Sequence, residues 1–165
     1  MSYDLEKSIG FKINQTANKL NNKYNQLLQS FDIAPEQRVT LEIIKYETDV
    51  TQTKIANILG KDKTTISRTL NTLESKSLIT KTQIDKRTNL IQLTQKGEEI
   101  LNESSSCVKT FRKNLTSKLD SIQRRNFLDA LDNLIAEAEI ALKQESHQKA
   151  LAIWNKHLGN KFPTI

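Results

Sequence analysis

The stretch VTQTKIANILGKDKTTISRTL, residues 50–70, decides the fold because it specifies two short helices and the turn between them. Thr51 stands where its hydroxyl can cap a first helix, and Gly60 can end that helix in a left-handed conformation. Two residues later, Asp62 can cap a second helix. Two helices joined by a tight turn that contains glycine are typical of a helix-turn-helix.

The second predicted helix, residues 62–74, has one apolar face and one hydrogen-bonding face. At about 100° per residue, Ile66, Leu70 and Leu73 share an arc of about 60°, so these three are expected to face the core. The opposite face and its flanks hold no acid, and their residues are Lys61, Thr64, Thr65, Ser67, Arg68, Asn71 and Ser75. In a major groove, arginine suits guanine, asparagine suits adenine, and threonine suits phosphates and the thymine methyl group. The alternative is a polar face that meets only solvent.

Two short segments rich in Ile, Leu and Thr follow this helix and predict a two-stranded ribbon. They are SLITKTQ, residues 77–83, and TNLIQLT, residues 88–94, with the charged sequence IDKR between them. We expect the ribbon to project the bases Lys81, Lys86 and Arg87 toward the DNA backbone or the minor groove. A recognition helix followed by a basic ribbon predicts a winged helix.

Positive charge is concentrated in the same part of the chain. The 165 residues have a formal net charge of +6 and a pI near 9.4. Residues 54–87 hold eight bases and three acids, a local excess of five. A basic surface on a helix-turn-helix favours a polyanionic partner, and double-stranded DNA fits the geometry.

Long amphipathic helices are predicted on both sides of the winged helix. Residues 5–31 carry one apolar stripe, formed by Ile9, Ile13, Ala17, Leu20, Tyr24, Leu27 and Phe31. Such a narrow stripe predicts packing along another long helix, either in a second copy of the chain or within one subunit. Pro35 begins the next predicted helix, which runs to about Glu47. Its apolar face is assigned to Val39, Ile43 and Tyr46, with Leu41 and Ile44 on the flank.

Two further long helices are predicted after the ribbon. Thr94 can cap the first, whose register holds Ile100, Ser104, Cys107, Phe111 and Leu115. Asp120 and Gln123 form a capping box for the second, which bears Phe127, Leu131, Leu134, Ile135, Ala138 and Leu142. One small winged helix cannot cover three apolar stripes, so a homodimer is expected. Two-fold symmetry would place two recognition helices about one duplex turn apart and predicts a pseudo-palindromic site.

The residues after position 145 predict one additional short helix, with apolar residues at helical spacing and Gly159 as a stop. This extension either packs on the core and dimer interface, which we favour, or holds a neighbouring molecule. The predicted segments are therefore a dimerisation helix in 1–34, a DNA-binding domain in 35–95, dimerisation helices in 96–145 and an extension in 146–165.

The scarcity of reactive side chains excludes several classes of function. Cys107 is the only cysteine, so no disulfide can form within the chain. A small buried hydrophobe is its favoured role, and a disulfide between symmetry mates is the alternative. His147 and His157 belong to no set of metal ligands or catalytic groups, so neither an enzyme nor a cofactor is expected. No apolar run has the length of a signal peptide or a membrane span, which predicts a cytoplasmic protein.

The segments APEQRV, TQTKIANILGKDKTTISRTLNTLESKSLI, DKR and LTQKG resemble the MarR family of bacterial transcription regulators. The resemblance extends from about residue 8 to 145. It implies a mainly α fold with a small β-wing, in which a winged helix-turn-helix domain is joined to long dimerisation helices. It also implies an obligate homodimer on duplex DNA and a small, often aromatic and anionic ligand between these two parts.

The resemblance also implies roles for single residues. The helix from Asp62 to Glu74 would read the major groove through Lys63, Thr64, Thr65, Ser67 and Arg68. Arg87 resembles the wing arginine that enters the minor groove, and Asp85 resembles the carboxylate that orients it without touching DNA.

The chain departs from the family pattern at two places. Only residues 80–84 separate Ile79 from Asp85, so the wing is expected to be short. Ser77 stands where the family favours glycine, and a left-handed conformation there would cost about 1 kcal/mol.

The sequence thus predicts a homodimeric, sequence-specific transcription regulator, most simply a repressor that blocks polymerase at a promoter. The alternative is a winged helix that binds another protein and does not read DNA sequence. Acids or exposed leucines on the recognition face would favour that alternative, whereas this face carries bases and hydroxyls.

Overall fold

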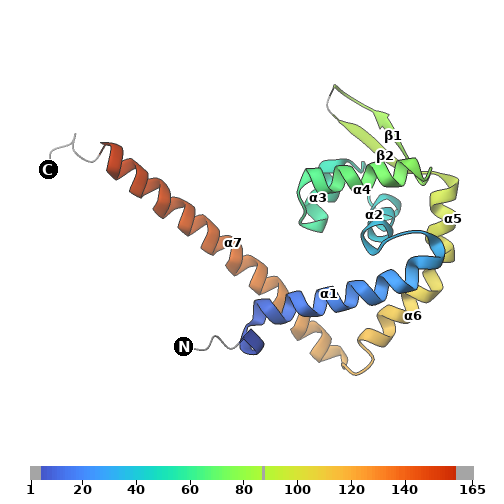
Figure 1. Cartoon of the computed structure of the whole chain (residues 1–165), viewed down its shortest axis with the longest axis horizontal. Coiled ribbons are helices and arrows are strands. Elements are labelled where there is room, and N and C mark those ends of the chain that lie inside the picture. Colours follow the sequence, from blue (N-terminus) through green and yellow to red (C-terminus); the bar gives the residue numbers. More distant parts are fainter. Residues whose placement is uncertain (1–4, 87, 159–165) are drawn as a thin grey trace. The chain divides into compact units, whose positions relative to one another are not determined.

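A computed structural model describes residues 5–86 and 88–158 of the chain. It divides into two compact units, Met1–Arg112 and Lys113–Ile165. The elements in chain order are η1 (Leu5–Lys7), α1 (Ile9–Leu28), η2 (Gln29–Phe31), α2 (Pro35–Tyr46), α3 (Gln52–Leu59), α4 (Lys63–Ser75), β1 (Ile79–Gln83), β2 (Asn89–Leu93), α5 (Gln95–Glu103), α6 (Ser105–Leu115) and α7 (Ser121–Leu158). The fold is mainly helical with one two-stranded antiparallel wing, as predicted (Figure 1).

The helix-turn-helix is formed by α3 and α4, and its predicted caps are confirmed. Thr51 Oγ1 accepts the Lys54 N–H at 3.3 Å at the start of α3. Gly60 ends α3 with φ +61°, in the left-handed region that favours glycine. Asp62 Oδ1 accepts the Thr65 N–H at 2.8 Å and caps α4. Each of these caps is formed by residues at most five positions apart, so the two helices and the turn are specified locally.

The apolar face of α4 is buried as predicted, and the end of this helix directs the chain into the wing. Ile66, Leu70 and Leu73 all belong to the core. The Leu78 N–H donates to the Leu73 carbonyl at 2.9 Å, and Ser77 has φ +59°. This is a Schellman-type end, in which Ser77 adopts the left-handed conformation.

The wing is a short hairpin whose strands have five residues each. Its antiparallel register pairs Ile79 with Leu93 and Gln83 with Asn89. Residues 84–88 connect the strands, and the hairpin projects beyond the α3–α4 pair (Figure 1). The Ile91 N–H donates to the Val50 carbonyl at 2.8 Å, which ties β2 to the residues before α3.

The core of the first unit differs from the predicted stripe on α2. Tyr46, expected to be buried, is 76% exposed, whereas Leu41 and Ile44, expected on the flank, are buried. The reason is that α2 packs against α1, α4, α5 and β2, so its buried arc is broader than one stripe. On α3, Ala56 is buried, whereas Ile58 is 49% exposed.

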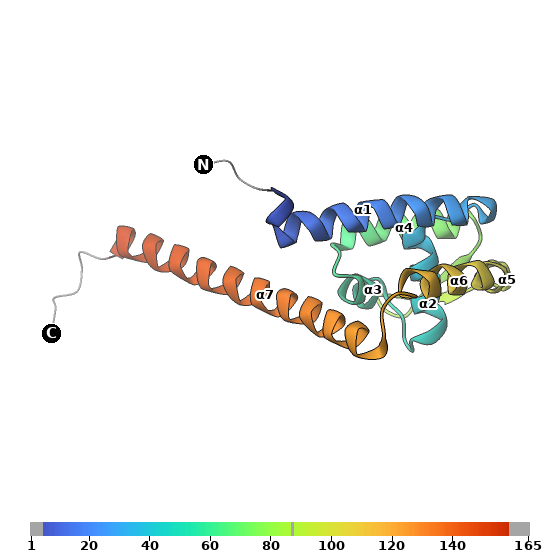
Figure 2. The same cartoon turned by 90° about the horizontal axis from the view of Figure 1, so that it is seen from below.

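Helix α1 contacts α2 and lies across it (Figure 2). The predicted helix over residues 5–31 is divided into η1, α1 and η2. Leu28, outside the predicted stripe, is fully buried, while Ile9 and Ile13 of that stripe are exposed. Tyr24 stacks on Phe111 of α6 with ring centroids 5.3 Å apart, which attaches α1 to α6.

The single long helix predicted after Thr94 is broken at Ser104, between α5 and α6. Thr94 caps α5 as predicted, since its hydroxyl accepts the Gly97 N–H at 3.0 Å. At the break, buried Ser104 accepts a hydrogen bond from Arg38 Nε at 2.7 Å. Cys107 packs against the core just beyond the break.

The second unit contains α7, which begins with the predicted capping box. Asp120 Oδ1 accepts the Gln123 N–H at 2.8 Å, and Gln123 Oε1 accepts the Asp120 N–H at 3.0 Å. Helix α7 continues without a break to Leu158, so the separate short helix expected after residue 145 is not formed. The predicted stop at Gly159 lies outside the described residues. None of the helices in residues 5–86 and 88–158 has an apolar stretch that could cross a bilayer.

Candidate nucleic-acid interface

A groove of about 350 Å³ lies between the start of α3, the outer face of α4 and the wing. We call it the α4 groove, and it is lined by Thr51, Gln52, Thr53, Lys63, Ser67, Leu70, Asn71, Lys81, Thr88, Asn89 and Ile91. Four predicted site residues, Lys63, Ser67, Asn71 and Lys81, therefore lie in one concave surface. Its charged members are Lys63 and Lys81, and exposed Lys63 is the one available to a polyanion, since Lys81 is paired with Glu74.

The other predicted residues of the recognition helix lie in different surroundings. Thr64 and Arg68 are exposed on α4. Thr65 Oγ1 donates to Asp62 Oδ2 at 2.6 Å, so this hydroxyl belongs to the helix cap. Hydrogen bonds from the side chain and the backbone of Thr65 hold the pKa of Asp62 below its ordinary value. Asp62 is therefore a fixed anion that organises the start of α4.

Lys61 is directed toward α2. Its Nζ lies 2.5 Å from Glu36 Oε2, and Thr69 Oγ1 of α4 donates to Glu36 Oε1 at 2.7 Å. Partial burial raises the pKa of Glu36, but the hydrogen bonds from Lys61 and Thr69 outweigh it, so the pKa lies below its ordinary value. Glu36 of α2 thus binds both the turn before α4, through Lys61, and the middle of α4, through Thr69, a role that the sequence pattern did not reveal.

Lys81 does not project from the wing, and that prediction is wrong. Its Nζ lies 2.8 Å from Asn71 Oδ1 and 2.7 Å from Glu74 Oε2. The physical reason is strand alternation, because Lys81 pairs with buried Ile91 and therefore lies on the face of the hairpin that meets α4.

The tip of the wing carries Lys86, which is exposed. The N–H groups of Ile84 and Asp85 both donate to the Thr88 carbonyl, at 3.0 and 3.3 Å, and close the connection. Arg87 lies outside the described residues, so its minor-groove role and its orientation by Asp85 stay predictions.

Several polar residues of the α4 groove were missed by the motif. Gln52 Nε2 donates to the Lys63 carbonyl at 2.7 Å, and so connects the first turn of α3 to the first residue of α4. Thr53 lies on the same turn, and Thr88 and Asn89 enter from the wing. The cap at Thr51 could have pointed to Gln52 and Thr53, because a helix-turn-helix places the start of its first helix near the DNA backbone.

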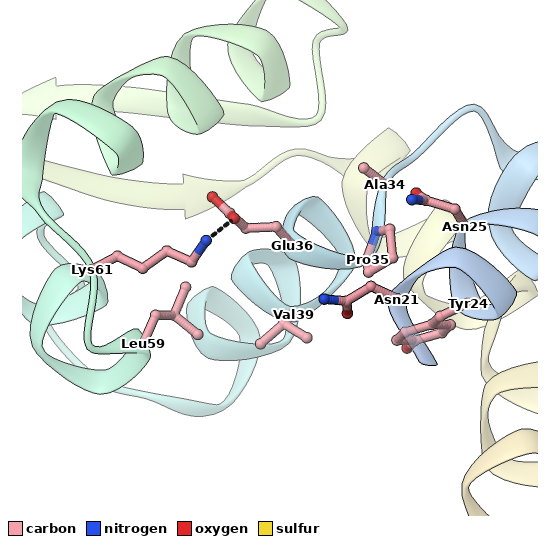
Figure 3. Close-up of a pocket in the computed structure, with 9 residues that line it drawn as sticks. All are labelled: Asn21, Tyr24, Asn25, Ala34, Pro35, Glu36, Val39, Leu59 and Lys61. Carbon is pink, nitrogen blue, oxygen red and sulfur yellow. Dashed lines mark hydrogen bonds and ion pairs between the residues drawn. The ribbon is translucent and has the colours of Figure 1, made fainter. Parts of the chain in front are cut away.

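A second hollow of about 400 Å³ opens between α1, α2 and the end of α3. Its lining is Asn21, Tyr24, Asn25, Ala34, Pro35, Glu36, Val39, Leu59 and Lys61, and Figure 3 shows the Lys61–Glu36 ion pair beside it. We call it the α1–α2 pocket. Burial raises the pKa of Tyr24 in the pocket wall above the ordinary value of a phenol.

Residues 33–88 match the model of the MarR family. The chain carries a MarR-family domain. This domain spans α2, α3, α4 and β1, and so contains every residue predicted from the recognition helix.

Solved structures with the same fold extend the match beyond that domain. A MarR/EmrR family transcriptional regulator from Acinetobacter sp. ADP1 is 28% identical with a TM-score of 0.76, over 83% of this chain and 99% of that one. MepR from S. aureus, in a DNA complex, is 25% identical with a TM-score of 0.73, over 79% and 98% of the two chains. A MarR variant from E. coli complexed with operator DNA is 23% identical with a TM-score of 0.71, over 81% and 98%.

Proposed function

We propose that this chain is a homodimeric transcription regulator whose α4 enters the major groove of duplex DNA. The observation that carries the proposal is the exposed face of α4, which presents Lys63, Thr64 and Arg68 to solvent. No acidic residue occurs between Lys63 and Leu73. Major-groove reading needs such donors on a helix that is held rigidly from behind. The buried face of α4 supplies that support.

The wing and the start of α3 would contact the DNA backbone on either side of α4. In this proposal Lys86 approaches phosphates, and Arg87 enters the minor groove with Asp85 as its orienting carboxylate. The hydroxyls of Thr51 and Thr53 are available to phosphates from the other wall of the α4 groove.

Dimerisation is supported by apolar side chains that a single copy leaves exposed. In the first unit they include Ile9, Phe11 and Ile13 of α1. In the second unit they include Ile122, Phe127, Leu128, Leu134, Ile135, Ile140 and Leu142 of α7. We propose that residues 1–34 and 96–145 pair two copies, that residues 35–95 bind DNA, and that the extension in 146–165 adds to the same interface.

Two recognition helices related by a two-fold axis would read a pseudo-palindromic promoter site, and occupancy of that site would block polymerase. We further propose that a small aromatic anion releases the DNA by binding in the α1–α2 pocket. Tyr24, Val39 and Leu59 supply apolar surface there, and Lys61 would bind the anion only by releasing Glu36, its present ion-pair partner. Both DNA-binding domains of the dimer must fit successive major grooves at once. A ligand that favours another distance between these two domains would therefore lower DNA affinity.

The test is selection of genomic fragments by the purified chain, followed by titration of the enriched fragment against a scrambled one. Arg68→Ala is expected to weaken binding to the enriched fragment by about 1 to 3 kcal/mol and to narrow the gap between the two DNAs. Lys63→Ala should weaken binding to both DNAs alike, because a phosphate contact carries no sequence information.

Lys19→Ala is the matched control, since it removes one exposed charge from α1 and should leave both affinities unchanged. Equal losses on both DNAs for Arg68→Ala would remove Arg68 from base reading. If no fragment is enriched, the proposed function is wrong, and a winged helix that binds another protein becomes the better description.

A further inference from the structure

The wing is fastened to α4 by three side chains, Lys81 from β1 and Asn71 and Glu74 from α4, which we call the β1–α4 clip. Lys81 Nζ lies 2.8 Å from Asn71 Oδ1 and 2.7 Å from Glu74 Oε2. The Lys81 side chain is only 19% exposed, although Glu74 is 47% exposed. Asn71 and Glu74 are three residues apart on α4, so both point to the same side of that helix.

The chemistry of the β1–α4 clip conflicts with a direct DNA role for two of its members. A phosphate that approached Lys81 would also approach the Glu74 carboxylate, and the two negative charges would repel each other. Asparagine reads adenine with both its amide oxygen and its amide nitrogen. Asn71 Oδ1 already accepts a hydrogen bond from Lys81 Nζ, so this contact holds the amide toward the wing and leaves one lone pair of the oxygen for any other donor.

We propose that Lys81, Asn71 and Glu74 are positioning residues, which hold the wing against the recognition helix so that both engage DNA as one rigid body. Lys81 then contributes no phosphate contact, and Asn71 does not read adenine through both amide atoms. The DNA part of this inference rests on the proposed function. The β1–α4 clip itself does not, because it exists in the free protein.

The first test of the positioning role is the salt dependence of affinity for the DNA fragment that the wild-type chain enriches. A lysine that contacts one phosphate changes the slope of log K against log salt by about 0.9. Lys81→Met is expected to lower affinity about tenfold and to leave that slope unchanged. Lys86→Met, at the exposed tip of the same hairpin, is the matched control and is expected to reduce the slope by about 0.9.

For Glu74→Gln, a positioning role and a phosphate contact of Lys81 predict opposite changes in DNA affinity. If Glu74 positions the wing through Lys81, this variant weakens DNA binding about as much as Lys81→Met, although it removes a negative charge near the DNA. If Lys81 were a phosphate contact that Glu74 restrains, Glu74→Gln would strengthen binding and Lys81→Met would reduce the slope. Either of those results would overturn the proposal.

A measurement without DNA separates the β1–α4 clip from the proposed function. Hydrogen exchange of the β1 and β2 backbone amides should be about tenfold faster in Lys81→Met and in Glu74→Gln, and the double variant should add little to either. Unchanged protection in both single variants would show that no clip exists. If the chain binds no DNA but the exchange behaves as expected, the proposed function fails and the clip stands as a structural device.

Discussion

Replacing Glu42 by glutamine is expected to destabilise the first unit, because Glu42 is the carboxylate paired with buried Arg38. Only 2% of the Arg38 side chain is exposed. Its Nη1 lies 2.9 Å from Glu42 Oε1, its Nε donates to Ser104 Oγ at 2.7 Å, and its Nη2 donates to the Leu101 carbonyl at 3.3 Å. Glu42 also binds Arg112 of α6 through both guanidinium Nη atoms, at 2.7 and 3.2 Å.

The size of the expected loss in unfolding free energy follows from the burial of Arg38. Removing one partner of a buried ion pair costs about 3 to 5 kcal/mol, because the remaining charge has no compensation. The lower end applies here, since Glu42 is 22% exposed and Arg38 keeps its hydrogen bonds to Ser104 and Leu101. For a chain of this length, a free-energy loss of that size lowers the melting temperature by about 6 to 12 °C.

The effect also has a defined pH dependence. Burial raises the pKa of Glu42, but the hydrogen bond from Arg112 and the charges of Arg38 and Arg112 outweigh it, so the pKa lies below 4.5. A carboxyl group whose pKa is lowered on folding stabilises the folded state fully above its unfolded pKa and loses this effect as pH falls through the folded pKa. The stability gap between wild type and Glu42→Gln should therefore be complete at neutral pH and close below pH 4.5.

The assay is thermal unfolding followed by circular dichroism at one fixed protein concentration, since assembly changes apparent stability. Glu47→Gln is the matched control on the same helix end. Glu47 pairs with Lys54 at 2.9 Å but is 46% exposed, so its loss should cost less than about 1 kcal/mol. Equal shifts for Glu42→Gln and Glu47→Gln would refute the argument that burial makes the Arg38 pair important.

Three backbone predictions can be checked together by urea unfolding. Ser77→Gly should raise stability by about 1 kcal/mol, because Ser77 has φ +59°, and a lower midpoint would contradict the assigned strain. Gly97→Ala should lower stability by about 1 to 3 kcal/mol, because an added Cβ would overlap the Leu78 carbonyl oxygen; an unchanged midpoint would disprove this close packing. Gly10→Ala should raise stability by about 0.5 to 1 kcal/mol, because a Cβ added there has no atom within 4 Å. A lower stability of this variant would contradict the assignment of Gly10 to an ordinary, unhindered helical position.

The parts of the fold that were predictable depend on interactions between near neighbours in sequence. The caps at Thr51, Asp62 and Asp120 each involve residues within three positions, so their residue types are sufficient to indicate them. The left-handed end at Ser77 was indicated only by the family pattern, which favours glycine at that position. The two-stranded wing was indicated by composition and by the charged residues between its strands.

The parts of the fold that were not predictable depend on residues far apart in sequence, or on which face of a helix or strand packs against its neighbours. Arg38 and Ser104 are 66 positions apart, and nothing local indicates that this pair forms at the place where α5 ends and α6 begins. Lys81 could be assigned to the ribbon but not to its inner face, since this depends on how the hairpin meets α4. The buried arc of α2 was misplaced for a related reason, because periodicity marks one stripe and α2 is covered from several directions.

The most direct test of the central claim is fluorescence anisotropy at about 0.15 M salt, with DNA from immediately upstream of the coding sequence titrated against a scrambled duplex of equal length and composition. If α4 reads the major groove, the upstream fragment should bind at least about a thousandfold more tightly than the scrambled one. Identical isotherms for the upstream fragment, the genome-selected fragment and the scrambled duplex would contradict the account.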